Sequence, residues 1–310
     1  MEILIKTTNA CNLSCTHCLD SQNKNGQAIS YPFELLETWL PKHANVAFFG
    51  GEPLLGDLNA MYQLAKKRQD CFWRITTNLV KPLTVLDIAV LKQMDVITTS
   101  FDIGVRFSSI KQLLTWMRNV ERIAKYTTAT RRLNICMTKE LLAKPNIEKK
   151  LLKLLEILRF DEVFFSKIID NGEEASNHQP SSQRQEEFME TFYELSKYSI
   201  INCCVENILN TQYVEDYKES PDCSSTSLTI HPSGNITTCS QFCEYSDGFA
   251  NIITDTYEET FNKRKLCKAH AMCLTCEFFD ICEKSCWKED WTKGCPYYKQ
   301  FAHKIRTQEL

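Results

Sequence analysis

The chain of 310 residues is long enough for one large α/β domain with a smaller appendage, and its hydrophobic content of 43% is ordinary for a globular protein. The net charge of −3, without a run of basic residues, argues against a nucleic-acid-binding surface. The sequence lacks a signal peptide and any stretch of the ~18 apolar residues that cross a bilayer, so we expect a cytoplasmic protein that binds no membrane. Sixteen cysteines in such a chain favour metal binding, with iron–sulfur clusters held by thiolates as the leading candidate.

Short apolar runs alternate with amphipathic segments over residues 1–167. Each run is apolar at nearly every position, as in strands buried on both faces of a parallel sheet, and the segments between them have the length of crossover helices. The predicted strands are 3–7, 46–49, 73–76, 96–99, 133–137 and 163–165, and the predicted helices are 58–67, 85–93, 109–125 and 147–158. Six such units predict an α/β fold, a partial (β/α)6 barrel of the triosephosphate isomerase (TIM) type, with its chemistry at the carboxyl ends of the strands.

Two further regions follow the predicted barrel. Residues 168–220 are polar and helical, with the clearest helix over 182–198, and we interpret them as a bridge. Residues 221–310 form a predicted small domain that is rich in cysteine, because nine of the sixteen cysteines fall in the last 88 residues. Within it, residues 228–230 and 235–237 flank Pro-Ser-Gly, which predicts a hairpin with Gly234 in its turn.

The first predicted strand is followed by Cys11, Cys15 and Cys18, in the spacing C-x3-C-x2-C. Three thiolates leave a cubane cluster one ligand short, so the open iron can take the amino and carboxylate groups of a ligand such as S-adenosylmethionine (SAM). A zinc site usually has four ligands in paired sets, and His17, adjacent to Cys18, could not easily complete one. A Gly-Gly-Glu-Pro sequence at 50–53 directly follows the second predicted strand. Together these motifs resemble the radical SAM superfamily.

The resemblance implies a set of SAM contacts at the ends of the predicted strands. The family usually has a bulky aromatic residue before the third cysteine, and the imidazole of His17 can fill that role. Asn78 belongs to Thr-Thr-Asn, which resembles the family's Thr-Asn-Gly with Leu79 in place of the glycine. For the Ser-x-Asp at 100–102, the alternative to a SAM contact is a cap of the next helix, near Ser108. For Arg106, the alternative to a SAM contact is an ordinary surface side chain. The implied cofactor-binding residues are Gly50, Gly51, Glu52, Asn78, Ser100, Asp102 and Arg106.

The cysteines of the C-terminal region match the seven-cysteine SPASM signature, an extension that one subgroup of radical SAM enzymes carries. The resemblance implies two auxiliary 4Fe–4S clusters beside the SAM-binding 4Fe–4S cluster, three in all. One would use Cys273, Cys276, Cys282 and Cys295, and the other Cys223, Cys239 and Cys286. For the second of these clusters, the fourth ligand is left open: Cys203, Cys204 and Cys243 are candidates, or the fourth iron stays open for substrate. A pair of zinc sites is the alternative to the two clusters. Cys71 and Cys136, in or beside strands, are interpreted as small buried hydrophobic residues.

The resemblance implies an oxidoreductase that cleaves SAM to a 5′-deoxyadenosyl radical and abstracts hydrogen from a C–H bond. Relatives with complete SPASM domains mostly modify peptides, so we expect oxidative maturation of a ribosomally made precursor peptide, with an electron donor such as flavodoxin or ferredoxin. The chain enters its first strand at residue 3, so we expect a leader peptide to be bound by the barrel, the bridge or a separate protein. A small-molecule dehydrogenase or epimerase is the alternative. Sulfatase maturation is less favoured, because Ser240 follows Cys239 where those relatives have Asp. The general base, the hydrogen donor and the oligomeric state stay undetermined.

Overall fold

The computed structural model describes residues 1–18, 26–168, 176–196, 227–238 and 248–264. Six parallel strands, each followed by at least one helix, make up the first part of the chain. The strands are β1 (Glu2–Thr8), β2 (Asn45–Gly50), β3 (Phe72–Thr76), β4 (Val96–Phe101), β5 (Thr130–Cys136) and β6 (Glu162–Ser166). The helices of these units are α1 (Glu34–Trp39), α2 (Leu58–Lys67), α3 (Val85–Leu91), α4 (Ile110–Tyr126), α5 (Lys139–Leu142), α6 (Ile147–Leu158) and α8 (Ser182–Ser196), with a short 3-10 turn η2 (Pro53–Leu55) after β2.

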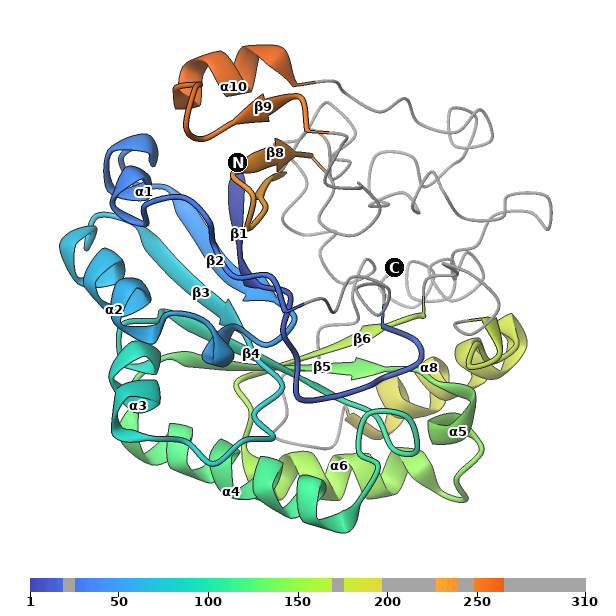
Figure 1. Cartoon of the computed structure of the whole chain (residues 1–310). Coiled ribbons are helices and arrows are strands. Elements are labelled where there is room, and N and C mark those ends of the chain that lie inside the picture. The colour runs from blue at the N-terminus through green and yellow to red at the C-terminus, as the bar shows by residue number, and fades with distance from the viewer. Residues whose placement is uncertain (19–25, 169–175, 197–226, 239–247, 265–310) are drawn as a thin grey trace, which may run out of the picture.

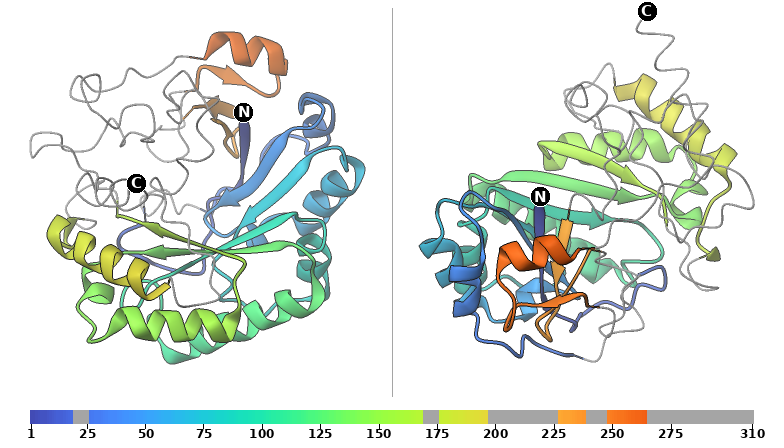
Figure 2. Two further views of the ribbon diagram at one scale, coloured as in Figure 1. Left: turned by 180° about the vertical axis from the view of Figure 1, so that it is seen from behind. Right: turned by 90° about the horizontal axis from the view of Figure 1, so that it is seen from above.

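The strands form one curved sheet that does not close into a barrel among the described residues. Its order is β6-β5-β4-β3-β2-β1-β7-β8-β9, so β6 and β9 are its edges. Helices α2, α3, α4 and α6 lie along the outer side of this sheet (Figures 1 and 2). The predicted α/β class and the six βα units are therefore confirmed, as an open rather than a closed parallel sheet.

The predicted hairpin also forms, and it extends the same sheet. Strand β7 (Ser227–Ile230) runs antiparallel to β8 (Asn235–Thr237), and Gly234 takes a φ of +87° in the turn between them. Strand β7 also pairs in parallel with β1, with Ile3 opposite Leu228. Strand β9 (Ala250–Asn251) and helix α10 (Tyr257–Lys263) complete the described part. The predicted boundary at residue 221 stays a prediction, since the residues around it lie outside the described ranges.

Local sequence signals set the ends of several helices. The side chain of Asp57 accepts a hydrogen bond from the backbone of Ala60 and caps α2, while Thr84 and Asp87 form a reciprocal capping box at α3. The apolar faces of the helices then pack on the sheet, where the rings of Phe48 and Trp73 stack with centroids 5.1 Å apart. In the described part of the chain, no helix has both the length and the apolar character needed to cross a membrane.

Candidate active site at the carboxyl ends of the strands

The Gly-Gly-Glu turn after β2 fixes the start of the loop that carries the three cysteines. The amide of Gly51 donates to the carbonyl of Thr8 at 2.8 Å, and the amide of Glu52 donates to the carbonyl of Ala10 at 2.8 Å. A Cβ atom on Gly51 would lie 2.3 Å from the Ala10 oxygen, and Gly50 has a φ of +132° that other residues rarely adopt. The resemblance implied that Gly50 and Gly51 bind the cofactor. In the structure their close neighbour is the backbone of the cysteine loop.

The three cysteines lie together on this loop, directly beyond the carboxyl end of β1. Cys15 is buried, whereas Cys11 and Cys18 are half-buried, and none of them forms a disulfide. The Sγ atom of Cys11 accepts a hydrogen bond from the backbone of Leu13 at 3.4 Å and one from Nδ2 of Asn78 at 3.8 Å. An iron–sulfur cluster is bound by cysteine sulfurs that accept hydrogen bonds from nearby N–H groups, as Cys11 does here. The partial exposure of Cys11 and Cys18 is compatible with such a cluster. The predicted cluster ligands therefore fit this cofactor.

Glu52 is a buried carboxylate that binds three donors from the protein. Its Oε1 accepts from Oγ1 of Thr77 at 2.6 Å and from the amide of Leu54 at 3.1 Å, and its Oε2 accepts from the amide of Asn78 at 2.7 Å. Burial raises the pKa of Glu52, and these hydrogen bonds and the charge of Lys81 oppose the rise. A carboxylate offers about four acceptor positions, so one remains on Oε2 for a ligand such as an ammonium group. Glu52 thus joins the ends of β2 and β3 and can still bind the predicted cofactor.

Asp102, directly after β4, is fully buried and does not cap a helix. Helix α4 is capped by Ser109, while Asp102 accepts from the amide of Arg106 at 2.7 Å and from its Nε at 3.1 Å. The capping alternative for Asp102 was therefore wrong. The alternative that Arg106 is a surface side chain was also wrong, because its side chain is only 15% exposed. Burial acts to lower the pKa of Arg106, but Asp102, Cys136 and Cys15 together outweigh it and raise that pKa above the ordinary value.

His17 brings the cysteine loop to the end of β4. Its Nε2 lies 3.6 Å from Oδ2 of Asp102, and the ring is buried with 9% of its surface exposed. Burial is the main cause that lowers the pKa of His17, and the neighbouring Asp102 opposes this. Ser100, two residues before Asp102 in β4, is half-buried. The predicted residues therefore lie together at the carboxyl ends of the parallel strands. They come from the cysteine loop and from the ends of β2, β3 and β4.

Several solved structures have a similar overall fold. No family model matches the chain, and no curated protein matches it. The structure is similar to native anSMEcpe with bound AdoMet (SAM), with a TM-score of 0.77 and 18% identity over 99% of this chain and 97% of that chain. Streptococcus suis SuiB bound to S-adenosylmethionine gives a TM-score of 0.68 and 18% identity over 92% of this chain and 72% of that chain. The chain therefore shares the fold of these two proteins.

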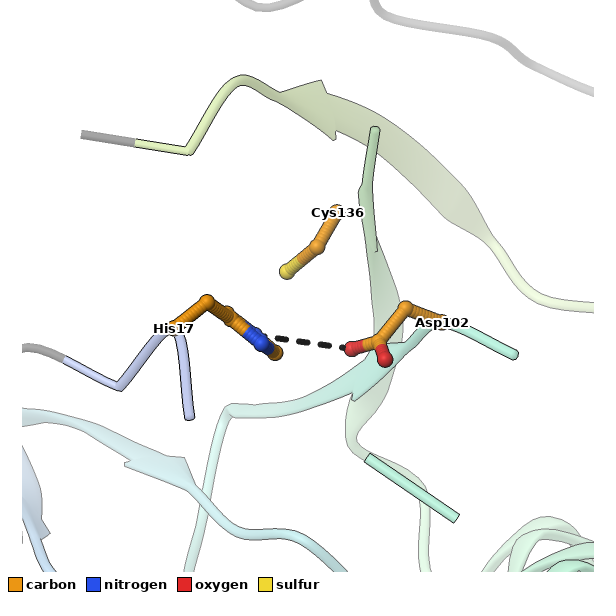
Figure 3. Close-up of side chains that lie close together, drawn as sticks. All are labelled: His17, Asp102 and Cys136. Carbon is orange, nitrogen blue, oxygen red and sulfur yellow. Dashed lines mark ion pairs between the residues drawn. The ribbon is translucent and has the colours of Figure 1, made fainter. Parts of the chain in front are cut away.

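Cys136, at the end of β5, belongs to this candidate active site and was not predicted as part of it. In the described part of the chain, His17, Asp102 and Cys136 form the only group of three possible metal ligands whose ligand atoms lie within 4.8 Å of one another (Figure 3). Nη2 of Arg106 lies 4.0 Å from Sγ of Cys136, and its Nε binds Asp102, so a guanidinium cation already neutralises this group. A bound metal cation would be repelled by that charge.

The thiol of Cys136 is therefore part of a polar corner rather than an apolar filler. It is half-buried, and it also accepts a hydrogen bond from Oγ of Ser166 at 3.8 Å. Burial raises the pKa of Cys136, and the charge of Arg106 opposes this. The interpretation of Cys136 as a small buried hydrophobic residue was wrong, whereas Cys71 is buried as expected. The position of Cys136 at the carboxyl end of a predicted strand was the signal in the sequence that could have placed it in the site.

The predicted auxiliary-cluster cysteines all lie outside the described residues, as do the candidates for the fourth ligand. The assignment of two auxiliary clusters therefore stays a prediction. These residues are Cys223, Cys239, Cys273, Cys276, Cys282, Cys286 and Cys295, with Cys203, Cys204 and Cys243 as the candidates.

Proposed function

We propose that this chain is a radical SAM oxidoreductase that oxidatively modifies a peptide. The main support is the convergence of the cysteine loop, Glu52, Asn78 and Asp102 at the carboxyl edge of one parallel sheet. These groups come from four successive strand ends, which is where the fold provides binding groups.

Each group has a distinct part in binding the proposed cofactor. Cys11, Cys15 and Cys18 would hold a 4Fe–4S cluster and leave one iron open for SAM. Glu52 has an acceptor position left for the amino group of SAM, and Asp102 is the carboxylate that we assign to a ribose hydroxyl. Bound in this way, the cofactor would supply the radical chemistry that removes a hydrogen atom from a substrate C–H bond. The buried side chains would hold it in place and exclude water.

A peptide substrate is the class that the similar structures favour. anSMEcpe is also solved with AdoMet and the Cp18Cys peptide, at a TM-score of 0.76 and 18% identity over 99% of this chain and 97% of that chain. SuiB is also solved with its precursor peptide SuiA, at a TM-score of 0.65. We carry this substrate class over to the present chain, together with two auxiliary clusters in the C-terminal region as electron acceptors.

The test begins without any peptide. The anaerobically reconstituted chain with dithionite should convert SAM to methionine and 5′-deoxyadenosine, and it should bind close to twelve irons, as three 4Fe–4S clusters require. Replacing Cys11, Cys15 and Cys18 together by Ala should abolish this cleavage and leave roughly two-thirds of the iron. Zinc in place of iron, or iron without SAM cleavage, contradicts the proposal. Peptides encoded beside the gene, with SuiA and Cp18Cys as comparison probes, are then screened for a change in mass.

A further inference from the structure

A chain of hydrogen bonds runs beside the cysteine loop through His178. Its Nδ1 lies 2.7 Å from Oε1 of Glu140, and its Nε2 lies 2.6 Å from Oγ1 of Thr16. An ionised carboxylate only accepts hydrogen bonds, so Nδ1 carries the ring proton and donates it to Glu140. In the neutral ring, Nε2 then carries the lone pair and accepts the hydroxyl proton of Thr16. The contacts therefore orient the ring so that this nitrogen is directed toward the cysteine loop.

His178 lies at the same edge of the sheet as the proposed SAM site. Glu140 is in α5, directly after β5, and Thr16 lies between the predicted cluster ligands Cys15 and Cys18. The ring of His178 meets that of His17 edge to face, with centroids 6.4 Å apart. One side chain thus separates His178 from the carboxylate of Asp102. The side chain of His178 is 20% exposed, so its basic nitrogen is not sealed in the core.

Among the other titratable groups described at these strand ends, Glu52 and Asp102 are engaged within the protein, Cys136 carries a proton, and the side chain of His17 is less exposed (8%) than that of His178 (20%). Glu52 binds three donors within the protein, and Asp102 is fully buried against Arg106. Burial raises the pKa of Cys136, which favours the protonated thiol. His178 combines a ring nitrogen that, among the described residues, contacts only the hydroxyl of the exposed Thr16 with a carboxylate that orients the ring, which is the arrangement of a general base.

We propose that His178 is the proton acceptor in the oxidation of the substrate, with Glu140 as its positioning residue. This inference rests on the proposed function. Once a hydrogen atom has left a substrate carbon, a bond forms between that carbon and a heteroatom of the peptide, and the bond of the heteroatom to hydrogen breaks. The proton goes to Nε2 of His178, and the remaining electron goes to an iron–sulfur cluster as the acceptor. Thr16 holds the place that the heteroatom of the substrate takes.

The first test concerns the imidazole alone and needs no substrate. Long-range ¹H–¹⁵N spectra of the full chain, labelled at the histidine nitrogens and recorded before and after iron is added, report which ring nitrogen carries hydrogen. We expect the Nδ1–H form at His178 in the wild type, and a mixture of both forms in Glu140→Ala. The His178→Gln spectrum assigns the signal. An Nε2–H form in the wild type overturns the proposal.

The second test measures how many modified peptides are formed per 5′-deoxyadenosine, with the peptide that the wild type modifies. Because general bases typically contribute about 10²–10⁴-fold, this ratio should fall about 100-fold or more in His178→Gln. The control is His43→Gln, which removes an exposed histidine. His43 lies just before β2, at the amino ends of the parallel strands, and contacts Asp70 there. This variant should keep the wild-type ratio.

The outcomes separate the two proposals. A wild type that does not cleave SAM contradicts the proposed function. A wild type that cleaves SAM and modifies its peptide, with an equal ratio in His178→Gln, overturns only the role of His178. Iron content and SAM affinity are measured in the same samples, since a loss of either in His178→Gln would instead show a structural role for this contact with the cysteine loop.

Discussion

Replacing Gly51 by Ala should both destabilise the protein and displace the cysteine loop. The added Cβ would lie 2.3 Å from the carbonyl oxygen of Ala10, whereas ordinary contact begins at 3.4 Å, so the loop must move by about 1.1 Å. The hydrogen bond from Glu52 to Ala10 is 2.8 Å long, as is that from Gly51 to Thr8, and neither survives a shift of that size along its direction.

The magnitude follows from these contacts. Two backbone hydrogen bonds contribute about 1 kcal/mol each, and overpacking of a tight site costs about 1–3 kcal/mol. We therefore expect Gly51→Ala to lower the free energy of unfolding by about 3–5 kcal/mol. Gly56→Ala is the matched control, because Gly56 has an ordinary φ of −79° and its added Cβ would lie 3.2 Å from the nearest atom. That cost is small, and the stiffer unfolded chain offsets about 0.5 kcal/mol of it.

The assay is urea denaturation of both variants and the wild type, followed by iron analysis after anaerobic reconstitution. Gly51→Ala should unfold at a clearly lower urea concentration and bind fewer irons, while Gly56→Ala should resemble the wild type in both. Equal unfolding curves and equal iron content for the two variants would refute the conclusion that the turn holds the cysteine loop through this close approach.

Three further outcomes test the site and the fold. Glu52→Gln should weaken SAM binding without loss of iron, by about 10- to 150-fold if a charge-assisted hydrogen bond of about 1.5–3 kcal/mol is lost, and unchanged affinity in isothermal titration contradicts the placement of the amino group. Asp102→Asn should likewise weaken SAM binding while iron is kept; wild-type affinity would show that this carboxylate serves only Arg106. Burial, together with the charge of Lys6, lowers the pKa of His231 from 6.5 to about 4. The unfolded chain then binds more protons between these values, so the stability from neutral His231 is complete above pH 6.5 and is lost toward pH 4, by up to ~3 kcal/mol. His231→Gln should flatten the unfolding free energy over this range, and parallel pH curves for both proteins would contradict it.

The sequence alone determined the elements and the cluster motif, because both depend on residues close together in the chain. The predicted helices 58–67 and 147–158 coincide with α2 and α6, since apolar spacing indicates both and Asp57 also caps α2. The order of six strands and helices followed from the same patterns. The spacing of Cys11, Cys15 and Cys18 was sufficient to predict three thiols on one loop after the first strand.

Only the tertiary structure decided which side chains meet at the strand ends. Thr16 and His178 are 162 residues apart in the chain and 2.6 Å apart in space, and Cys136 meets His17 only because β5 lies beside β4. Likewise, β7 joins β1 across more than two hundred residues. Local periodicity carries no information on such pairs, because they depend on the order and register in which the strands assemble. The cysteine loop could thus be predicted from its own residues, whereas the polar groups that surround it required the assembled sheet.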